Sequence, residues 1–241
     1  MQISMSLYGT NPKYLMGAVQ NAKSRLDFYP TSELIIYFDR KVPKIVLDTL
    51  RNYDVKLFSG EETGLSNPMM WRFLPAFKPG DKTVIVRDTD SRFTERERAA
   101  VEEWLRSDRT LHIMRDHPMH EAPILGGMWG IQGATPGLQS NILMDDETTG
   151  QYGADQRFLA RHLYYPFRNS RLVHDEFFCF EQDSQCFPLA SNAGEFVGES
   201  YNEREEYDVE LRKTNSRTTS RLTKTKRCLK VRIKLLMRRY T

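Results

Sequence analysis

A short apolar run that ends in two acidic residues is the feature that most limits what this chain can fold into. Val84, Ile85 and Val86 are consecutive β-branched residues, a pattern typical of a strand buried on both faces of a mostly parallel sheet. Asp88 and Asp90 follow where this strand would leave the sheet. In open α/β folds the ligand crevice lies outside the carboxyl ends of the strands, so both carboxylates are expected to face a substrate.

The spacing of these two acids predicts a metal site. Mg²⁺ and Mn²⁺ typically take one or two carboxylates and fill their remaining positions with water and substrate phosphate oxygens. We therefore expect Asp88 and Asp90 to bind Mn²⁺ or Mg²⁺ together with a phosphorylated substrate. The alternative is a solvated turn after a core strand, because Asp is one of the residues that dominate turns.

Strands and helices are expected to alternate along the N-terminal part of the chain. Asn11 and Pro12 have the positions of a helix cap and of the first helical residue. The pattern predicts a doubly wound α/β fold, with a mostly parallel central sheet flanked by helices. The expected strands cover residues 3–7, 34–38, 55–58, 84–86, 111–114 and 172–175, and the expected helices cover residues 12–22, 43–53, 95–107 and 152–163.

Length and cysteine content limit the class and the location of the protein. The chain has 241 residues and is 39% hydrophobic, which is enough to bury the core of one large domain. It has no run near the ~18 apolar residues of a membrane span and no signal-peptide pattern at its start. Cys179, Cys186 and Cys228 are few and include no C-x-x-C pair, which favours free thiols in a reducing compartment. We expect a cytoplasmic protein.

The net charge of +3 conceals two oppositely charged regions. Residues 212–241 contain twelve Lys and Arg and no acid, so residues 1–211 carry a net charge of −9. We expect a catalytic domain over residues 1–190, an acidic linker over 191–211 and a basic, partly apolar C-terminal tail over 212–241. An acidic body of this kind repels a nucleic acid backbone, so nucleic acid is not an expected partner.

Three further groups of residues are candidates for ligand contacts. Arg72 lies at the edge of an aromatic cluster, where a guanidinium can bind phosphate or carboxylate, or form a structural pair with an acid. His117 and His120 suit polar substrate contacts or local turn hydrogen bonds better than zinc, because neither Cys nor an H-E-x-x-H motif completes a zinc site. Gly126 and Gly127 allow the backbone to approach a ligand or a neighbouring segment closely.

The last candidates lie at the start of a helix and at the end of a strand. Asp155 and Gln156 lie near the start of the amphipathic helix expected over residues 152–163. Acids are favoured there by the helix dipole, so a capping role for Asp155 is the alternative to catalysis. His174 is expected at the end of the strand over residues 172–175, where it could reach a ligand.

The order of these features resembles a known family of enzymes. A W-R-F sequence is followed by R-D-x-D-S, H-x-M-R-D-H-P, Gly-Gly-Met-Trp-Gly, Tyr-Gly-x-Asp-Gln and a late histidine. This order is similar to that of nucleotide-sugar glycosyltransferases of the GT-A fold, particularly the small microbial and large-DNA-virus domains. The resemblance covers about residues 1–180 and does not include the basic tail.

The resemblance implies a GT-A-like fold and a reaction in which a sugar moves from a UDP- or GDP-sugar donor to a glycan or glycoconjugate acceptor. Asp155 would be the catalytic residue, acting as general base in an inverting enzyme or stabilising an oxocarbenium-like transition state in a retaining one. The implied metal ligands are Asp88, Asp90 and His174, and the implied donor- or substrate-binding residues are Arg72, Arg87, Asp88, His117, Gly126, Gly127 and Gln156.

Two other functions fit parts of the pattern. Acids, histidines and a basic tail also suit a metal-dependent phosphoesterase or nuclease. A non-enzymatic, membrane-tethered binding module would use the acidic pair only for structure. The tail over residues 212–241 interleaves its cations with apolar residues, which indicates an element that binds an anionic membrane surface, so peripheral membrane association is also expected.

Overall fold

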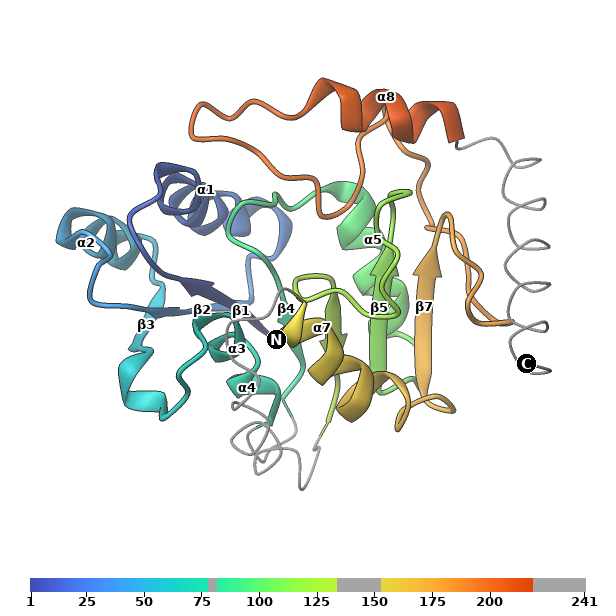
Figure 1. Cartoon of the computed structure of the whole chain (residues 1–241), viewed down its shortest axis with the longest axis horizontal. Helices are drawn as coiled ribbons and strands as arrows, with labels where there is room; N and C mark the ends of the chain where they lie inside the picture. The colour runs from blue at the N-terminus through green and yellow to red at the C-terminus, as the bar shows by residue number, and fades with distance from the viewer. Residues whose placement is uncertain (78–81, 134–152, 219–241) are drawn as a thin grey trace.

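The computed structural model describes residues 1–77, 82–133 and 153–218 of the chain. Helices and strands alternate through most of this part, as the sequence predicts (Figure 1). The strands are β1 (Gln2–Leu7), β2 (Glu33–Phe38), β3 (Lys56–Ser59), β4 (Val84–Val86), β5 (Leu111–Arg115), β6 (Trp129–Ile131) and β7 (Arg171–Asp175). The helices are α1 (Pro12–Phe28), α2 (Lys44–Asn52), η1 (Glu61–Thr63), α3 (Pro68–Trp71), α4 (Leu74–Phe77), α5 (Glu95–Leu105), α7 (Ala154–Leu159), η3 (Ala160–Tyr164) and α8 (Val209–Thr218).

The seven strands form one mixed sheet in the order β3-β2-β1-β4-β6-β5-β7. All neighbouring pairs are parallel except the two that involve β6, which runs antiparallel to β4 and to β5. From β1 the chain continues to β2 and β3 on one side, whereas β4 lies on the other side of β1. The doubly wound, mostly parallel sheet predicted from the sequence is therefore confirmed, and its order reverses between β1 and β4.

Helices cover both faces of the sheet (Figure 1). Helices α1, α2 and α5 pack on one face, and α3, α4 and α7 pack on the other. Val84 and Val86 belong to the hydrophobic cluster on the second face, whereas Ile85 belongs to the cluster on the first. This strand is buried on both faces, which explains why its apolar residues are continuous rather than alternating.

Local sequence signals set the starts of two helices that approach the sheet edge. The Asn11 side chain accepts a hydrogen bond from the Lys13 amide at 3.0 Å, and Pro12 occupies the first helical position of α1. Thr94 caps α5 in the same way, because its hydroxyl accepts from the Glu97 amide at 3.1 Å. Both caps satisfy backbone donors that a helix leaves unpaired at its first turn.

Strand β6 is the one strand that the sequence pattern did not predict. Its three residues are Trp129, Gly130 and Ile131, too few to show a period, and they include a glycine, which is unfavourable in strands. The segment is a strand because β4 and β5 pair with it on both sides. A side chain at Gly130 would press against Trp104 and Ile85, so the glycine allows α5 to pack closely on the sheet.

The segment predicted to be a linker, residues 191–211, instead packs on the domain. Val197 is 1% exposed, and its amide donates to the Asp116 carboxylate at 2.9 Å. Glu199 is buried and accepts two hydrogen bonds from Arg212 of α8, each at 2.7 Å. The predicted domain end near residue 190 is therefore too early, because these buried contacts carry the folded region on into α8.

The remainder of the predicted basic tail, residues 219–241, lies outside the described residues. Cys186 is exposed, whereas Cys179 is disulfide-bonded. The expectation of free thiols is therefore wrong for Cys179. Within the described ranges, every helix is too short or too polar to cross a membrane.

Candidate functional site

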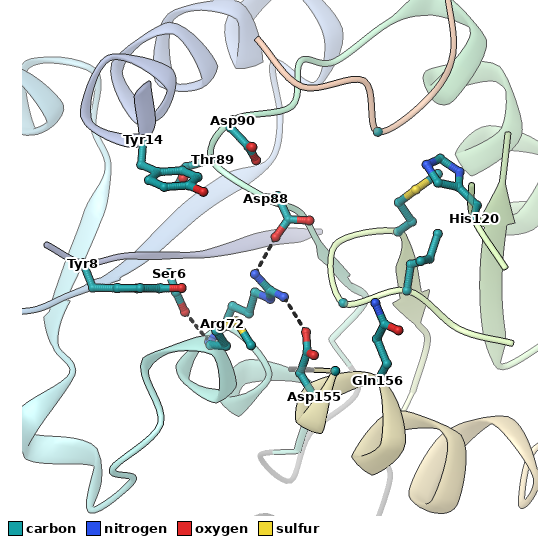
Figure 2. A pocket seen from close by; sticks show the side chains of 16 residues that line it. Ser6, Tyr8, Tyr14, Arg72, Asp88, Thr89, Asp90, His120, Asp155 and Gln156 are labelled. Carbon is teal, nitrogen blue, oxygen red and sulfur yellow. Dashed lines mark hydrogen bonds and ion pairs between the residues drawn. The ribbon is translucent and has the colours of Figure 1, made fainter. Parts of the chain in front are cut away.

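A pocket of about 340 Å³ opens at the carboxyl ends of β1 and β4, where the strand order reverses (Figure 2). This is the position where open α/β sheets bind ligands, and the volume is within the range of small-molecule sites. The pocket is lined by residues from β1, α1, α3, the segment after β4, the β5–β6 connection, α7 and the C-terminal segment. These residues are Ser6, Tyr8, Tyr14, Met69, Arg72, Asp88, Thr89, Asp90, His120, Leu125, Gly126, Met128, Gly153, Asp155, Gln156 and Gly198.

Arg72 joins two carboxylates in the centre of this pocket (Figure 2). Its Nη1 donates to Asp88 Oδ1 at 2.5 Å, and its Nη2 donates to Asp155 Oδ2 at 3.1 Å. The Arg72 backbone amide also donates to the Ser6 hydroxyl at 3.0 Å, which ties the end of α3 to β1. Because the guanidinium is planar and its donors are fixed, it holds Asp88 and Asp155 at a defined separation.

Two glycines make room for this arrangement. A Cβ atom at Gly126 would collide with the Arg72 guanidinium and the Asp155 carboxylate. A Cβ atom at Gly127 would collide with the Asp88 carboxylate and lie 2.8 Å from the Asp88 amide nitrogen. Any side chain at either position would displace the ion pairs, so the close approach of the β5–β6 connection requires glycine at both.

Asp88 faces the pocket in a position where its ionised form is unfavourable. Its side chain is 42% exposed, and the protein surrounds the rest of the group. Desolvation raises the pKa of Asp88, Arg72 opposes this change, and the negative charges of Asp90 and Asp155 raise the pKa further. A cation beside Asp88 would relieve this repulsion and favour its ionised form.

The free oxygens of this acidic pair fit a metal ion that is shared with a substrate. Asp90 Oδ2 pairs with Lys13 Nζ at 2.7 Å, and Asp88 Oδ1 pairs with Arg72. Asp88 Oδ2 and Asp90 Oδ1 accept no hydrogen bond from the residues that the structure describes. Among those residues there is no group of three or more His, Cys, Asp or Glu that could enclose a metal ion. The donor set therefore suits Mg²⁺ or Mn²⁺ completed by water and phosphate oxygens.

Two tyrosines and two polar side chains occupy opposite sides of the acidic cluster (Figure 2). Tyr8 directly follows β1 and Tyr14 lies in α1, and both rings are about two-fifths exposed, at 38% and 37%. His120 and Gln156 lie on the other side, beyond Asp155 (Figure 2). The pocket thus has an aromatic end, an acidic centre and a polar end.

Comparisons with known proteins find a similar fold among glycosyltransferases. No protein-family model and no curated protein matches the chain. The chain is similar to galactosyltransferase LgtC, solved with donor and acceptor sugar analogs, at 15% identity and TM-score 0.44 over 74% of each chain. It is also similar to glucosyl-3-phosphoglycerate synthase from Mycobacterium tuberculosis, solved with Mn²⁺, UDP and phosphoglyceric acid, at 15% identity and TM-score 0.45 over 71% and 67% of the two chains.

A third solved structure is that of glycosyltransferase GlyE from Streptococcus pneumoniae TIGR4. It shares 14% identity with this chain at TM-score 0.47, over 73% of this chain and 46% of its own. Similarities at these identities concern the fold, so the function is argued below from the side chains of the pocket.

The structure brings most of the predicted site residues together. Arg72, Asp88, Asp90, Gly126 and Gln156 all line the pocket, as does Asp155. Helix α7 has Gly153 at its N-cap with no side-chain capping bond, so Asp155 does not cap the helix. Its carboxylate turns to Arg72 instead. Gly127 lies behind Asp88 and gives that carboxylate its space.

Arg87 does not enter the pocket, although it precedes Asp88. Its side chain is buried on the other side of the backbone, where Nε donates to Glu97 at 2.6 Å and Nη1 donates to the Trp129 carbonyl at 3.0 Å. Successive residues of an extended chain point in opposite directions, so the neighbour of a pocket residue points away from the pocket. Arg87 therefore holds α5 and β6 against β4, and the predicted donor contact is wrong.

His117 and His120 have different positions. His117 is 1% exposed, its Nε2 lies 3.1 Å from the Leu211 carbonyl, and its Nδ1 accepts from the Met119 amide at 3.1 Å. It connects the β5–β6 connection to α8 and does not line the pocket, contrary to the prediction. His120, three residues later, does line it.

His174 is also absent from the described pocket lining. Its ring is fully buried in β7, and its Nδ1 lies 2.8 Å from Nε2 of His112 in β5. Desolvation lowers the pKa of His112 well below its usual value, with the neighbouring His174 as the next cause. The two rings form part of the sheet core, so His174 is not placed to complete the metal site with Asp88 and Asp90.

Several pocket residues could not be identified from the sequence. Tyr8 follows β1 in the way that Asp88 follows β4, and residues that follow strands tend to line the crevice. However, a tyrosine after a strand has no pattern that distinguishes it from other tyrosines. Gly198 has φ +85° and packs against the Met128 side chain, which brings the C-terminal segment into the pocket wall. Nothing in the local sequence predicts this long-range contact.

Proposed function

We propose that this protein is a metal-dependent glycosyltransferase that transfers a sugar from a nucleoside-diphosphate sugar to a hydroxyl acceptor. The observation that supports the proposal most directly is that Arg72 bonds to two carboxylates in the same pocket. One is Asp88, which suits a metal ion shared with a diphosphate, and the other is Asp155. Asp88 and Asp90 would hold Mn²⁺ or Mg²⁺, which stabilises negative charge on a departing diphosphate.

The reaction has simple requirements. The bond between the anomeric carbon and the β-phosphate oxygen breaks, and its electron pair leaves with the nucleoside diphosphate. The acceptor oxygen bonds to the anomeric carbon, and the acceptor proton passes to a carboxylate or phosphate oxygen. Asp155 Oδ1 accepts no hydrogen bond from the described residues, so it is available either to take this proton or to face positive charge on the sugar.

The aromatic end of the pocket suits the nucleoside. The Tyr8 and Tyr14 rings present apolar faces beside the acidic centre, and stacking on an aromatic ring contributes about 1–3 kcal/mol per base in nucleic-acid complexes. This arrangement would leave the diphosphate near Asp88 and Asp90, and would direct the sugar toward Asp155. The family resemblance of the sequence implies that the donor is a UDP- or GDP-sugar and that the acceptor hydroxyl belongs to a glycan or glycoconjugate.

Release of nucleotide from a panel of donors tests the proposal. The full chain is incubated with UDP- and GDP-sugars, with Mn²⁺, Mg²⁺ or EDTA, and free nucleoside diphosphate and thermal shift are measured. We expect release and stabilisation with at least one donor, and loss of both in EDTA. Cleavage of bis(p-nitrophenyl) phosphate without any response to nucleotide sugars would instead support a phosphoesterase, and no response to either substrate would contradict an enzymatic function.

We also propose that the basic tail, residues 212–241, binds an anionic membrane surface. Each Lys or Arg near an anionic leaflet contributes about 1 kcal/mol, and nine of the twelve cations follow residue 218, so part of these nine would suffice for attachment. Co-sedimentation with phosphatidylserine vesicles at low salt tests this. The full chain should pellet with the vesicles, and a chain ending at residue 218 should pellet much less. Equal pelleting of both chains would contradict a role for the tail.

A further inference from the structure

The polar end of the pocket contains a histidine with a defined tautomer. His120 Nδ1 accepts a hydrogen bond from the Asp116 amide at 3.1 Å. In a neutral imidazole one nitrogen accepts and the other carries the proton, so the proton is on Nε2. Nε2 makes no hydrogen bond with the described residues, and the ring lines the pocket (Figure 2). His120 therefore offers the pocket a single neutral N–H donor.

Two other pocket residues have polar atoms without a hydrogen-bond partner among the described residues. The Gln156 side-chain amide forms no hydrogen bond with the described residues and points toward the pocket from α7 (Figure 2). Asp155 Oδ2 is held by Arg72, whereas its Oδ1 has no donor among the described residues. The pocket thus combines the N–H donor and the amide of its polar end with a carboxylate oxygen of its acidic centre.

The charges at the polar end of the pocket exclude anionic ligands. Arg72 is the only Lys or Arg among the described residues that line the pocket, and both of its terminal nitrogens already bond carboxylates. Burial lowers the pKa of His120 to about 3, and the neighbouring His117 and Arg115 add to the effect, so the ring carries no charge at neutral pH. A phosphate or carboxylate here would meet Asp155 with no free cation to offset the repulsion.

We propose that His120 and Gln156 form the acceptor subsite and select an uncharged acceptor with several hydroxyls, such as a neutral sugar. One hydroxyl reaches Asp155 Oδ1, and neighbouring hydroxyls bond to His120 Nε2–H and to the Gln156 amide. Leu125 and Met128 also line the pocket and could supply apolar surface for the C–H faces of a sugar ring. This inference rests on the proposed glycosyltransferase activity and adds the substrate class to it.

The first experiment compares acceptors of matched size. With the accepted donor and Mn²⁺, nucleotide release is measured with methyl glycosides of glucose, galactose and N-acetylglucosamine, and with glucose 6-phosphate, glucuronic acid and 3-phosphoglycerate. We expect at least one neutral glycoside to raise release above the rate with water, and the anionic compounds to have no effect. Preferential use of an anionic acceptor would overturn the proposal.

The second experiment separates acceptor binding from a structural role. His120→Asn keeps a polar atom near the Nδ1 position and removes the Nε2 donor, whereas His120→Gln can place an amide donor near the Nε2 position. We expect His120→Asn to raise the acceptor KM about five- to tenfold, the loss of roughly one hydrogen bond. His120→Gln should recover part of it. Control variant His162→Ala removes a histidine that does not line the pocket.

Two measurements keep this inference distinct from the proposed function. Calorimetric titration with UDP or GDP and Mn²⁺ measures binding at the donor site. This measurement is separate from acceptor binding, because His120 lies on the side of the pocket opposite Tyr8 and Tyr14 (Figure 2). If no donor binds or is cleaved, the glycosyltransferase proposal fails. If a donor is cleaved but no neutral glycoside is used, or if His120→Asn leaves the acceptor KM within twofold, only the acceptor subsite is wrong.

Discussion

Arg92 and Glu205, which are 113 residues apart, form an ion pair with two hydrogen bonds at 2.9 and 2.7 Å. The remaining Arg92 nitrogen, Nη1, donates to the Thr89 and Ser91 carbonyls at 3.2 and 2.7 Å. One guanidinium therefore connects the C-terminal segment to the backbone on both sides of Asp90. Glu205 has a φ of +62°, an uncommon conformation for a residue other than glycine, so the surrounding contacts hold it there.

Loss of this ion pair should loosen the proposed metal site more than the fold. Glu205 is 39% exposed, so Glu205→Gln should lower the free energy of unfolding by less than about 1 kcal/mol. Because Arg92 orders the backbone around Asp90, we expect nucleotide affinity in Mn²⁺ to fall roughly threefold. Urea unfolding and calorimetric titration measure the two effects, with Glu203→Gln as the neighbouring control. Equal losses of nucleotide affinity in Glu205→Gln and Glu203→Gln would show that the effect comes from net charge and not from the ion pair with Arg92.

Neutralising either acid of the D-x-D sequence should abolish metal-dependent nucleotide binding. Asp88→Asn and Asp90→Asn keep the side-chain shape but remove a charge that a divalent cation requires. Titration of each variant with UDP or GDP, with and without Mn²⁺, measures the effect, and Asp108→Asn serves as an exposed control, since its side chain is 92% exposed. Undiminished affinity in Mn²⁺ for both site variants would contradict the metal assignment.

Asp155 is expected to affect turnover rather than donor binding. Asp155→Asn keeps an oxygen for Arg72, and a group that acts in the transition state contributes little to ground-state affinity. We expect kcat to fall more than tenfold, about 1.4 kcal/mol or more of activation free energy, with the donor KM within threefold. Steady-state kinetics with the accepted donor provides the test. A kcat within tenfold of the parent protein would reduce Asp155 to a structural partner of Arg72.

His120 should make the protein less stable in mild acid. Its pKa is lowered to about 3 in the folded protein, whereas an unfolded histidine titrates near 6.5. Below pH 6.5 the unfolded chain binds a proton that the folded chain does not, so this stabilisation is present above pH 6.5 and is lost as the pH falls toward 3. At pH 5 the loss is up to about 2 kcal/mol. Urea unfolding at pH 7 and pH 5 should therefore show a smaller decrease for His120→Gln than for the parent protein.

The fold could be predicted largely because its strands and helices have strong local signals. The buried runs in β1, β2 and β4 and the cap at Asn11 are encoded within a few residues. Strand β6 could not be predicted, because its three residues form a strand only between β4 and β5. The packing of Val197 and Glu199 was equally hidden, since an acidic stretch has the same composition whether it is solvated or paired with Arg212.

A position at the end of a strand or at the start of a helix is only a partial guide to which residues line the pocket. Asp88, after a strand end, and Asp155, at a helix start, both line the pocket at the carboxyl edge of the sheet. Arg87 was included because of the family resemblance, and His174 also because it lies near a strand end, but the side chains of both point into the core of the domain. Which side of the backbone a residue faces depends on the local register, and the sequence alone does not supply this for short segments.

The antiparallel strand β6 also determines when the pocket can form during folding. Residues up to 86 supply β1 to β4 as one half of the sheet, and β5 and β7 belong to the other half; β6 joins the two. Gly126 and Gly127 lie immediately before β6, so the wall they form against Asp88 and Asp155 exists only after the halves have joined. A ligand that binds only this completed pocket stabilises the joined sheet. Nucleotide should therefore slow amide hydrogen exchange in β5 and β7, far beyond the residues it touches.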